Sequence, residues 1–197
     1  MIKKWNHIKL VFNYSLQNCS SLMLLLFFSF NSFSQSTSTE DQNNIKALVS
    51  LISEQLQLPI SDSIQINNNM FKAVLLSKEA YDKTSLIKSY HNLATWHEGN
   101  STLDSTIYYL EHAEKVSKDS RLPVLEAETY LKKGDAYKQR GDYGKAMAED
   151  FKALELYEKI DNQLGIAKCY TQLCDILYYQ EKYEEGADYC QKAIDIQ

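Results

Sequence analysis

Side chains that could support catalysis or metal binding are few in this sequence and poorly placed for either task. His91 and His97 are six residues apart, so they would project about 240° apart around a helix and would not converge on one metal ion. Asp135 and Asp175 form a candidate carboxylate pair, but acidic residues on a helical surface are more often solvated or ligand-facing than catalytic. The sequence has no Gly-rich phosphate loop, no His-Glu-x-x-His motif and no nucleophile elbow. We therefore expect a protein that is not an enzyme and that uses no metal ion or cofactor.

The elements that must carry these residues follow from a repeat with a period of 40 residues. Three columns of this repeat hold alanine, tyrosine and small side chains: Ala73, Ala113, Ala153 and Ala193; Tyr90, Tyr130 and Tyr170; Ala94, Gly134 and Cys174. A fixed period of this size is the signature of a solenoid, in which each unit buries its apolar face only against its neighbours. Residues 42–197 are therefore expected to form one continuous array.

Each repeat is predicted to fold as two helices. Within residues 123–160, Gly141-Asp142 interrupts the helical spacing of the apolar residues, and Asp161-Asn162 ends the second run. The same scheme predicts helix pairs at 42–57 with 62–80, at 84–98 with 103–118, and at 163–180 with 183–197, with Pro59 in the first turn. Only six Gly and two Pro occur, and strand signals are missing. The fold class is therefore all-α.

These positions resemble the tetratricopeptide repeat, which has aromatic, small and alanine residues at set places on its two helices. The residues that match best are Tyr130, Gly134, Tyr137, Tyr143, Ala146 and Ala153. The resemblance is close over 87–197 and loose over 47–86. It implies a right-handed α-solenoid of antiparallel helix pairs, with units near 47–86, 87–126, 127–166 and 167–197.

Two features depart from the tetratricopeptide pattern. The period is 40 residues rather than 34, which requires longer second helices or longer turns between repeats. Lys133 and Asp150 also occupy columns that are otherwise apolar. A small rotation of the helix would let Phe151 replace Asp150 in the core.

In this family the first helix of each pair lines a concave groove, and the resemblance implies the same binding surface here for a protein or peptide. Its residues would be Lys88, His91, Asn92, Thr95, Glu98, Leu131, Lys132, Asp135, Lys138, Lys168, Thr171, Gln172, Asp175 and Tyr178. Some relatives grip a C-terminal carboxylate with Lys and Asn one helical turn apart. That clamp is absent, because the corresponding pairs are His91/Thr95, Leu131/Asp135 and Thr171/Asp175.

Single residues of this surface carry more specific expectations. His91 should face the open groove, whereas His97 should pack against its neighbours. Tyr178 is the expected anchor for a partner, because tyrosine offers a large contact area at low entropic cost. Of the tandem tyrosines Tyr178 and Tyr179, one is expected on the surface and the other in the core.

The first 34 residues have the features of an export signal. Lys3, Lys4 and Lys9 precede an apolar run at 22–33, and Ser32 and Ser34 fit a small-x-small cleavage site. The run is shorter than the ~20 residues that span a bilayer as a helix. We expect a signal peptide at 1–34, a flexible lead-in at 35–41, and an exported, periplasmic protein. The alternative is a chain that an uncleaved N-terminal segment anchors in the membrane.

Three cysteines remain after the leader, Cys169, Cys174 and Cys190, and an odd number cannot form a closed disulfide framework. Cys174 and Cys190 fall in columns where the helices of a pair should approach closely. An oxidising compartment would then permit a disulfide between them. The alternative is three free and buried thiols.

The charge of the chain excludes one class of partner. The net charge is −5, and without Lys3, Lys4 and Lys9 it becomes −8, from 18 basic and 26 acidic residues. Such a surface repels phosphate backbones, so nucleic acid is not an expected partner.

Two functions remain open from the sequence. One is an exported scaffold that binds a protein or peptide. The other is the N-terminal sensory domain of a bacterial signal-transduction protein, a histidine kinase or a membrane-tethered transcription regulator, if the natural chain continues beyond Gln197. Ile194 and Ile196 would lack a cover, so self-association through the last helix is also expected. Contact with a membrane is expected only if the leader stays uncleaved or the chain continues.

Overall fold

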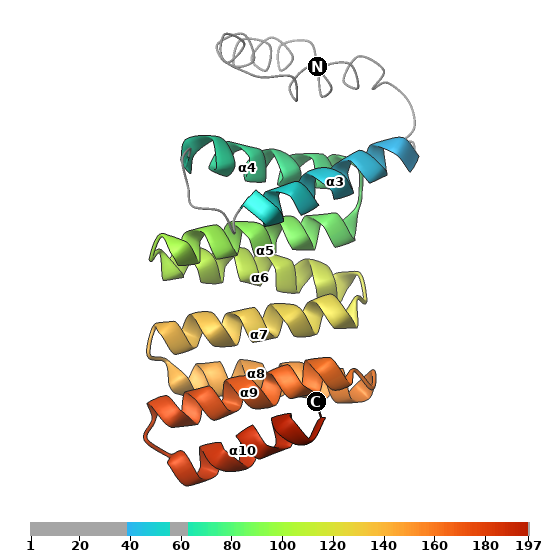
Figure 1. The fold of residues 1–197 in the computed structure, drawn as a ribbon. Helices are drawn as coiled ribbons and strands as arrows, with labels where there is room; N and C mark the ends of the chain where they lie inside the picture. Colours follow the sequence, from blue (N-terminus) through green and yellow to red (C-terminus); the bar gives the residue numbers. More distant parts are fainter. Residues whose placement is uncertain (1–38, 56–62, 197) are drawn as a thin grey trace, which may run out of the picture. The chain divides into compact units, whose positions relative to one another are not determined.

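Eight α-helices and no strand make up residues 39–55 and 63–196, which are the residues that the computed structural model describes (Figure 1). The helices are α3 (Thr39–Gln55), α4 (Ser63–Glu79), α5 (Lys83–Gly99), α6 (Leu103–Asp119), α7 (Pro123–Gln139), α8 (Tyr143–Lys159), α9 (Gln163–Tyr179) and α10 (Tyr183–Ile196). They belong to one compact unit of the chain, Thr39–Gln197. The prediction of an all-α fold is confirmed.

Some boundaries predicted from the sequence lie outside the described residues, and others differ from the ends of the helices. The expected signal peptide at 1–34 and the turn at Pro59 lie outside the described residues. Helix α3 begins at Thr39, so the last residues of the expected lead-in, 39–41, are helical rather than flexible. The first helices start at Lys83, Pro123 and Gln163, so unit boundaries near 87, 127 and 167 fall inside these helices. The 40-residue period gives the length of a unit but not the residue at which it begins. The turns between the helices show where each helix pair begins.

The 40-residue period comes from long helices and not from long turns. Helices α4 to α9 have 17 residues each, and three residues connect each helix from α4 onward to the next. The middle residue of every such connection has a positive φ, from 53° at Asp161 to 82° at Gly141. The residue after it donates its N–H to a carbonyl five residues earlier, as Asp142 does to Tyr137 at 2.9 Å. This is the Schellman arrangement that ends a helix.

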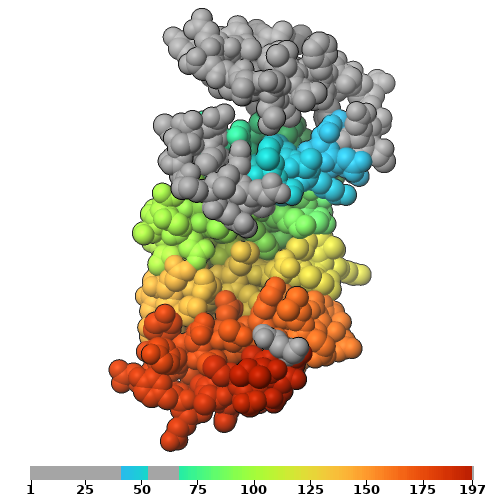
Figure 2. Space-filling view, viewed as in Figure 1, coloured from blue at the N-terminus to red at the C-terminus, as the bar shows by residue number. Residues whose placement is uncertain are grey.

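The helices form an inner and an outer layer. The first helices α3, α5, α7 and α9 each contact the next first helix. Among the described residues, no second helix (α4, α6, α8, α10) has such contacts with the next second helix. The first helices are therefore the more closely spaced, inner layer of the array. Figures 1 and 2 show the helices following one another in chain order from α5 to α10.

Small side chains fill the contacts between the helices. Ala73, Ala113 and Ala153 have no exposed surface, and Ala193 is also buried. At Gly186 on α10, an added Cβ atom would lie 3.4 Å from the Cys174 carbonyl oxygen of α9. The columns predicted from the repeat are thus the core of the array, because close helix packing leaves no room for larger side chains there.

The expectation for Asp150 and Phe151 is wrong. Asp150 is fully buried, whereas Phe151 is 41% exposed. The reason lies opposite, on α7: Gly134 has no side chain, and a Cβ atom there would collide with Asp150 Oδ1. Gly134 leaves the space that the carboxyl group fills, so α8 does not rotate to bring Phe151 inward.

Candidate functional site

The predicted groove residues lie on α5, α7 and α9, which form the inner layer. Those with exposed side chains are Lys88, Thr95, Lys132, Lys168, Thr171, Asp175 and Tyr178, and those that are half-buried are Glu98, Asp135, Lys138 and Gln172. The remaining three, His91, Asn92 and Leu131, are buried. Most of the predicted surface is therefore accessible to a partner.

His91 does not face the open groove as expected. It is 7% exposed, and its Nε2 lies 2.7 Å from the Thr129 hydroxyl. Because that hydroxyl donates to the Leu125 carbonyl oxygen at 2.6 Å, it accepts from His91, which therefore carries its proton on Nε2. Burial lowers the pKa of His91 to about 3, and the cations of Lys132 and Lys88 add to this effect. His91 is a neutral link between α5 and α7.

Asn92 and Leu131 also serve the contacts between helices. The Asn92 side-chain amide donates to the Val49 carbonyl oxygen of α3 at 3.2 Å. Leu131 packs in the core and accepts a 3.4 Å hydrogen bond on its carbonyl oxygen from Gln172 of α9. These residues hold consecutive first helices together and do not offer side chains to a ligand.

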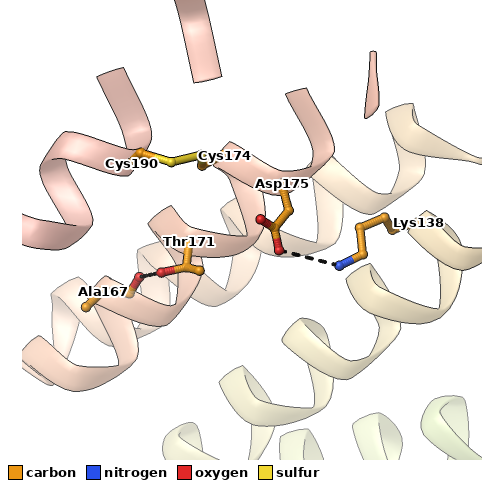
Figure 3. Close-up of a disulfide and its surroundings, with 6 residues drawn as sticks. All are labelled: Lys138, Ala167, Thr171, Cys174, Asp175 and Cys190. Carbon is orange, nitrogen blue, oxygen red and sulfur yellow. Dashed lines mark hydrogen bonds and ion pairs between the residues drawn. A yellow bond between two sulfur atoms is a disulfide. The ribbon is translucent and has the colours of Figure 1, made fainter. Parts of the chain in front are cut away.

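A chain of polar contacts, here called the polar ladder, crosses the inner layer from α5 to α9. It consists of Glu98, Gln139, Asp135, Lys138 and Asp175. The Gln139 amide donates to Glu98 Oε1 and, at 3.1 Å, to Asp135 Oδ2. Lys138 Nζ lies 2.8 Å from Asp135 Oδ1 and 3.9 Å from Asp175 Oδ2, the contact drawn in Figure 3. Gln139 was missed from the sequence, because an amide beside the turn carries no motif.

The electrostatics of the polar ladder differ along its length. Burial raises the pKa of Glu98, and the Asp135 charge adds to the rise, while the Gln139 hydrogen bond opposes it. Burial acts in the same sense on Asp135, but the hydrogen bond from Lys138 outweighs it and lowers the pKa of Asp135. The ladder therefore holds a carboxylate and an ammonium group in fixed places, where they can bind charged and hydrogen-bonding groups of a ligand.

Three exposed tyrosines and the half-buried Tyr143 lie beside this ladder, at the C-terminal end of α9 and at the starts of α8 and α10. This tyrosine cluster consists of Tyr143, Tyr178, Tyr179 and Tyr183. The Tyr178 ring lies 6.1 Å from Tyr179 and 5.5 Å from Tyr183, and Tyr143 stacks on Tyr179 at 6.3 Å, all between ring centres. Tyr178, Tyr179 and Tyr183 are 64%, 59% and 58% exposed, so the expectation that one of the tandem tyrosines is core is wrong. Both lie in the last turn of α9.

A disulfide joins α9 to α10 through Cys174 and Cys190, whose Cα atoms are 5.4 Å apart (Figure 3). Cys169 is a free, buried thiol, and burial raises its pKa to about 12. The same two positions one repeat earlier hold Gly134 and Asp150. Equivalent positions of a helix pair thus hold a disulfide in one repeat and a glycine that faces a buried carboxyl group in the preceding one.

The buried ionisable residues Lys133 of α7 and Asp150 of α8 differ in whether they have a partner. Lys133 Nζ lies 2.7 Å from Glu114 Oε2 and 3.4 Å from Glu149 Oε1, so its charge is paired. Neither carboxyl oxygen of Asp150 has a hydrogen-bond partner among the described residues. Burial raises the pKa of Asp150 to about 8, although the Lys138 charge opposes the rise. The surroundings of Asp150 therefore favour the protonated, neutral form of its carboxyl group.

Within 39–55 and 63–196, no group of three or more His, Cys, Asp or Glu side chains is placed to hold a metal ion. No helix in the described part of the chain combines the length and the apolar character needed to cross a bilayer.

Comparisons with known proteins bear on the fold. No protein-family model matches the chain, and no curated protein sequence matches it. Among solved structures, it is similar to aspartyl phosphate phosphatase F from Bacillus subtilis, with a TM-score of 0.71 and 15% identity over 81% of this chain and 41% of that protein. It is also similar to BtubC from P. vanneervenii, with a TM-score of 0.66 and 19% identity over 79% of this chain and 61% of that protein.

A third similar structure is a signal transduction ATPase with numerous domains from Pyrococcus horikoshii, which has a tetratricopeptide repeat sensor. The TM-score is 0.68, with 15% identity over 79% of this chain and 24% of that protein. The chain spans less than two thirds of each of these three proteins. They are helical-repeat proteins of the tetratricopeptide type, and the array of α3 to α10 has the same α-solenoid fold that its sequence predicts.

Proposed function

We propose that this chain is a non-enzymatic scaffold that binds a protein or peptide on the inner face of α5, α7 and α9. The observation that carries the proposal is the composition of that face, on which the polar ladder lies next to the exposed Tyr178 and Tyr179 at the end of α9. Fixed charges give a partner its register, and exposed tyrosines give it contact area. The helical-repeat fold supports the proposal, since such arrays use their concave surfaces for binding.

The binding test compares charge exchanges on the two layers. The inner variant combines Lys132→Glu on α7 with Asp175→Lys on α9, and the outer variant combines Lys115→Glu on α6 with Glu155→Lys on α8. All four side chains are exposed, and both variants leave the net charge unchanged. A tagged full-length chain captures partners from extract, and the inner variant should lose the wild-type partner while the outer variant keeps it. Equal capture by the two variants would contradict the proposal.

We also propose that the protein is exported to an oxidising compartment, the periplasm. The N-terminal leader motivates this proposal, and the Cys174–Cys190 disulfide supports it, because disulfides persist in such compartments. Cell fractionation and the mass of the mature chain test it. Cleavage after Ser34 with one free thiol is the expected result. A full-length cytosolic chain with four free thiols, those of Cys19, Cys169, Cys174 and Cys190, would contradict it.

A second candidate function is the sensory part of a signal-transduction protein. The similarity to a protein with a tetratricopeptide repeat sensor favours it. Sequencing the transcript past codon 197 separates the two functions. An open frame that encodes a membrane helix and an effector domain favours the sensor, whereas a stop codon favours the scaffold.

A further inference from the structure

Five tyrosines of the described array have a positive charge over their rings. Lysine or arginine side chains lie 4.9–5.9 Å from the ring centres of Tyr90, Tyr130, Tyr137, Tyr170 and Tyr189. A cation at this distance is attracted to the negative face of the ring. Cation–π pairing is thus a recurrent feature of this fold.

The tyrosine cluster has no such cation among the described residues. Its neighbours Arg140 and Lys145 lie over Tyr137 instead, at 5.1 and 5.6 Å. Lys138, the nearest cation of the polar ladder, is held by Asp135 at 2.8 Å. The rings of Tyr178, Tyr179 and Tyr183 are therefore exposed, electron-rich surfaces over which no cation of the described residues lies, although Tyr143 stacks on Tyr179.

The helix that ends in this cluster also lacks a positive charge at its C-terminus. Helices α6, α7 and α8 have Lys118, Lys138 and Lys159 in their last turns, where a cation offsets the negative end of the helix dipole. Helix α9 has no basic residue in its last turn and ends in Tyr178-Tyr179. Its carbonyl end adds to the attraction for an external cation.

The segment that contains most of the cluster is rich in acidic side chains. Between positions 175 and 188 the chain has five acidic residues and one basic residue, and all six are exposed: Asp175, Glu181, Lys182, Glu184, Glu185 and Asp188. A purely apolar partner would remove these carboxylates from water without pairing them, which costs free energy. A phosphate-bearing partner would be repelled. Lysine or arginine side chains of a partner can make cation–π contacts with the rings and ion pairs with the carboxylates.

We propose that the tyrosine cluster and its flanking carboxylates form a docking surface for a basic segment of a partner polypeptide, with Arg or Lys side chains over the rings of Tyr178, Tyr179 and Tyr183. The inference rests on the proposed binding function and specifies the chemistry of the partner. Arginine fits better than lysine, because its planar guanidinium group stacks on a ring while it donates to a carboxylate.

The first experiment measures binding of the full-length chain to labelled Gly-Ser peptides by fluorescence anisotropy. One peptide carries evenly spaced arginines, a second carries citrulline at the same positions, and a third carries glutamate. The arginine peptide should bind, and added salt should weaken its binding because exposed charges take part. The citrulline and glutamate peptides should bind at least about tenfold more weakly. No binding of the arginine peptide, or equal binding of the citrulline peptide, would overturn the inference.

The second experiment tests the rings. The triple variant Tyr178→Ala, Tyr179→Ala, Tyr183→Ala should weaken arginine-peptide binding about tenfold or more, from the summed effect of three exposed cation–π contacts. The triple Phe variant at the same positions keeps the rings and should stay within about threefold of wild type. The control is Tyr81→Ala with Tyr108→Ala, two exposed tyrosines away from the cluster, which should change nothing. Equal losses in the Ala and Phe variants would overturn the inference, and circular dichroism checks that each variant is folded.

Failure of this inference and failure of the proposed function give different results. If a captured partner is lost in the inner charge exchange but is insensitive to the Ala triple variant, the scaffold function stands and the basic docking surface is wrong. If the inner and outer charge exchanges capture the partner equally, the inner-face function is wrong, whatever the arginine peptide does.

Discussion

Replacing the buried Asp150 with Asn should remove a strong dependence of stability on pH. The carboxyl group has an unperturbed pKa of 3.8 and, in the folded array, a pKa raised to about 8 by burial. The folded state therefore holds a proton that the unfolded state releases between these two values. A raised pKa of this kind stabilises the fold fully below pH 3.8, and the contribution is lost as the pH rises toward 8.

The size of the effect follows from the shift. Each pKa unit corresponds to about 1.4 kcal/mol, so the loss between about pH 5 and pH 8 would be about 4 kcal/mol in a rigid structure. Movement of the helices and entry of water around an ionised carboxylate reduce it to roughly 2–4 kcal/mol. Asn has the same shape and no titrating group. The free energy of unfolding of the wild type should therefore fall by this amount relative to Asp150→Asn over that interval.

The assay is urea unfolding followed by circular dichroism at several pH values for both proteins. The difference between the two proteins matters, because His91 acts in the opposite direction: its lowered pKa of about 3 makes stability fall below pH 6.5 in both proteins. Asp188→Asn, which removes an exposed carboxylate of α10, is the matched control and should change stability by less than ~0.5 kcal/mol at every pH. A constant difference between wild type and Asp150→Asn across the interval would refute the burial of an unpaired carboxyl group.

Further substitutions test the disulfide, the turns and the buried face of the array. Removal of the disulfide through Cys174→Ala with Cys190→Ala should lower the free energy of unfolding by about 3 kcal/mol, because it opens a 16-residue loop; calorimetry that shows no lower midpoint would contradict this. Glu181→Gly should raise the free energy of unfolding by about 0.5–1 kcal/mol, because Glu181 has a φ of 60°, which glycine adopts without strain. Gly141→Ala should lower it, because Gly141 also has a positive φ. Changes of the opposite sign in urea unfolding would show that these two residues do not have left-handed backbone conformations. Tyr130→Ala should lower the free energy of unfolding by about 3 kcal/mol or more, because Tyr130 is buried. Tyr178→Ala should shift the thermal midpoint little, because Tyr178 is exposed. The reverse result would show that the assignment of Tyr130 to the core and of Tyr178 to the surface is wrong.

The sequence was sufficient for the helices and the core columns. The predicted pair 84–98 with 103–118 differs from α5 and α6 by one residue at most at each end, and the alanine column is buried throughout. This success has a physical reason. In a solenoid each helix meets an equivalent neighbour, so one buried position recurs at a constant interval and the pattern reports it several times.

Periodicity alone could not decide between neighbouring residues. Asp150 and Phe151 are adjacent, and residue type favoured Phe151 for the core, but the space opened by Gly134 on another helix reversed the outcome. Glu181 in a left-handed turn likewise carries no sequence signal, since glycine marks only the turn at Gly141. The site shows the same limit. His91 was placed on the correct helix, but its burial depends on Thr129 of the next repeat.

Site-specific photo-crosslinking tests the central claim, that the inner layer of first helices binds the partner, most directly. A photoreactive phenylalanine analogue replaces Lys132 or Thr171 on the inner layer, or Lys115 or Glu155 on the outer layer, all of them exposed positions. The captured partner should form adducts at the two inner positions and not at the two outer ones. Adducts at the outer positions, with none at Lys132 and Thr171, would contradict the account.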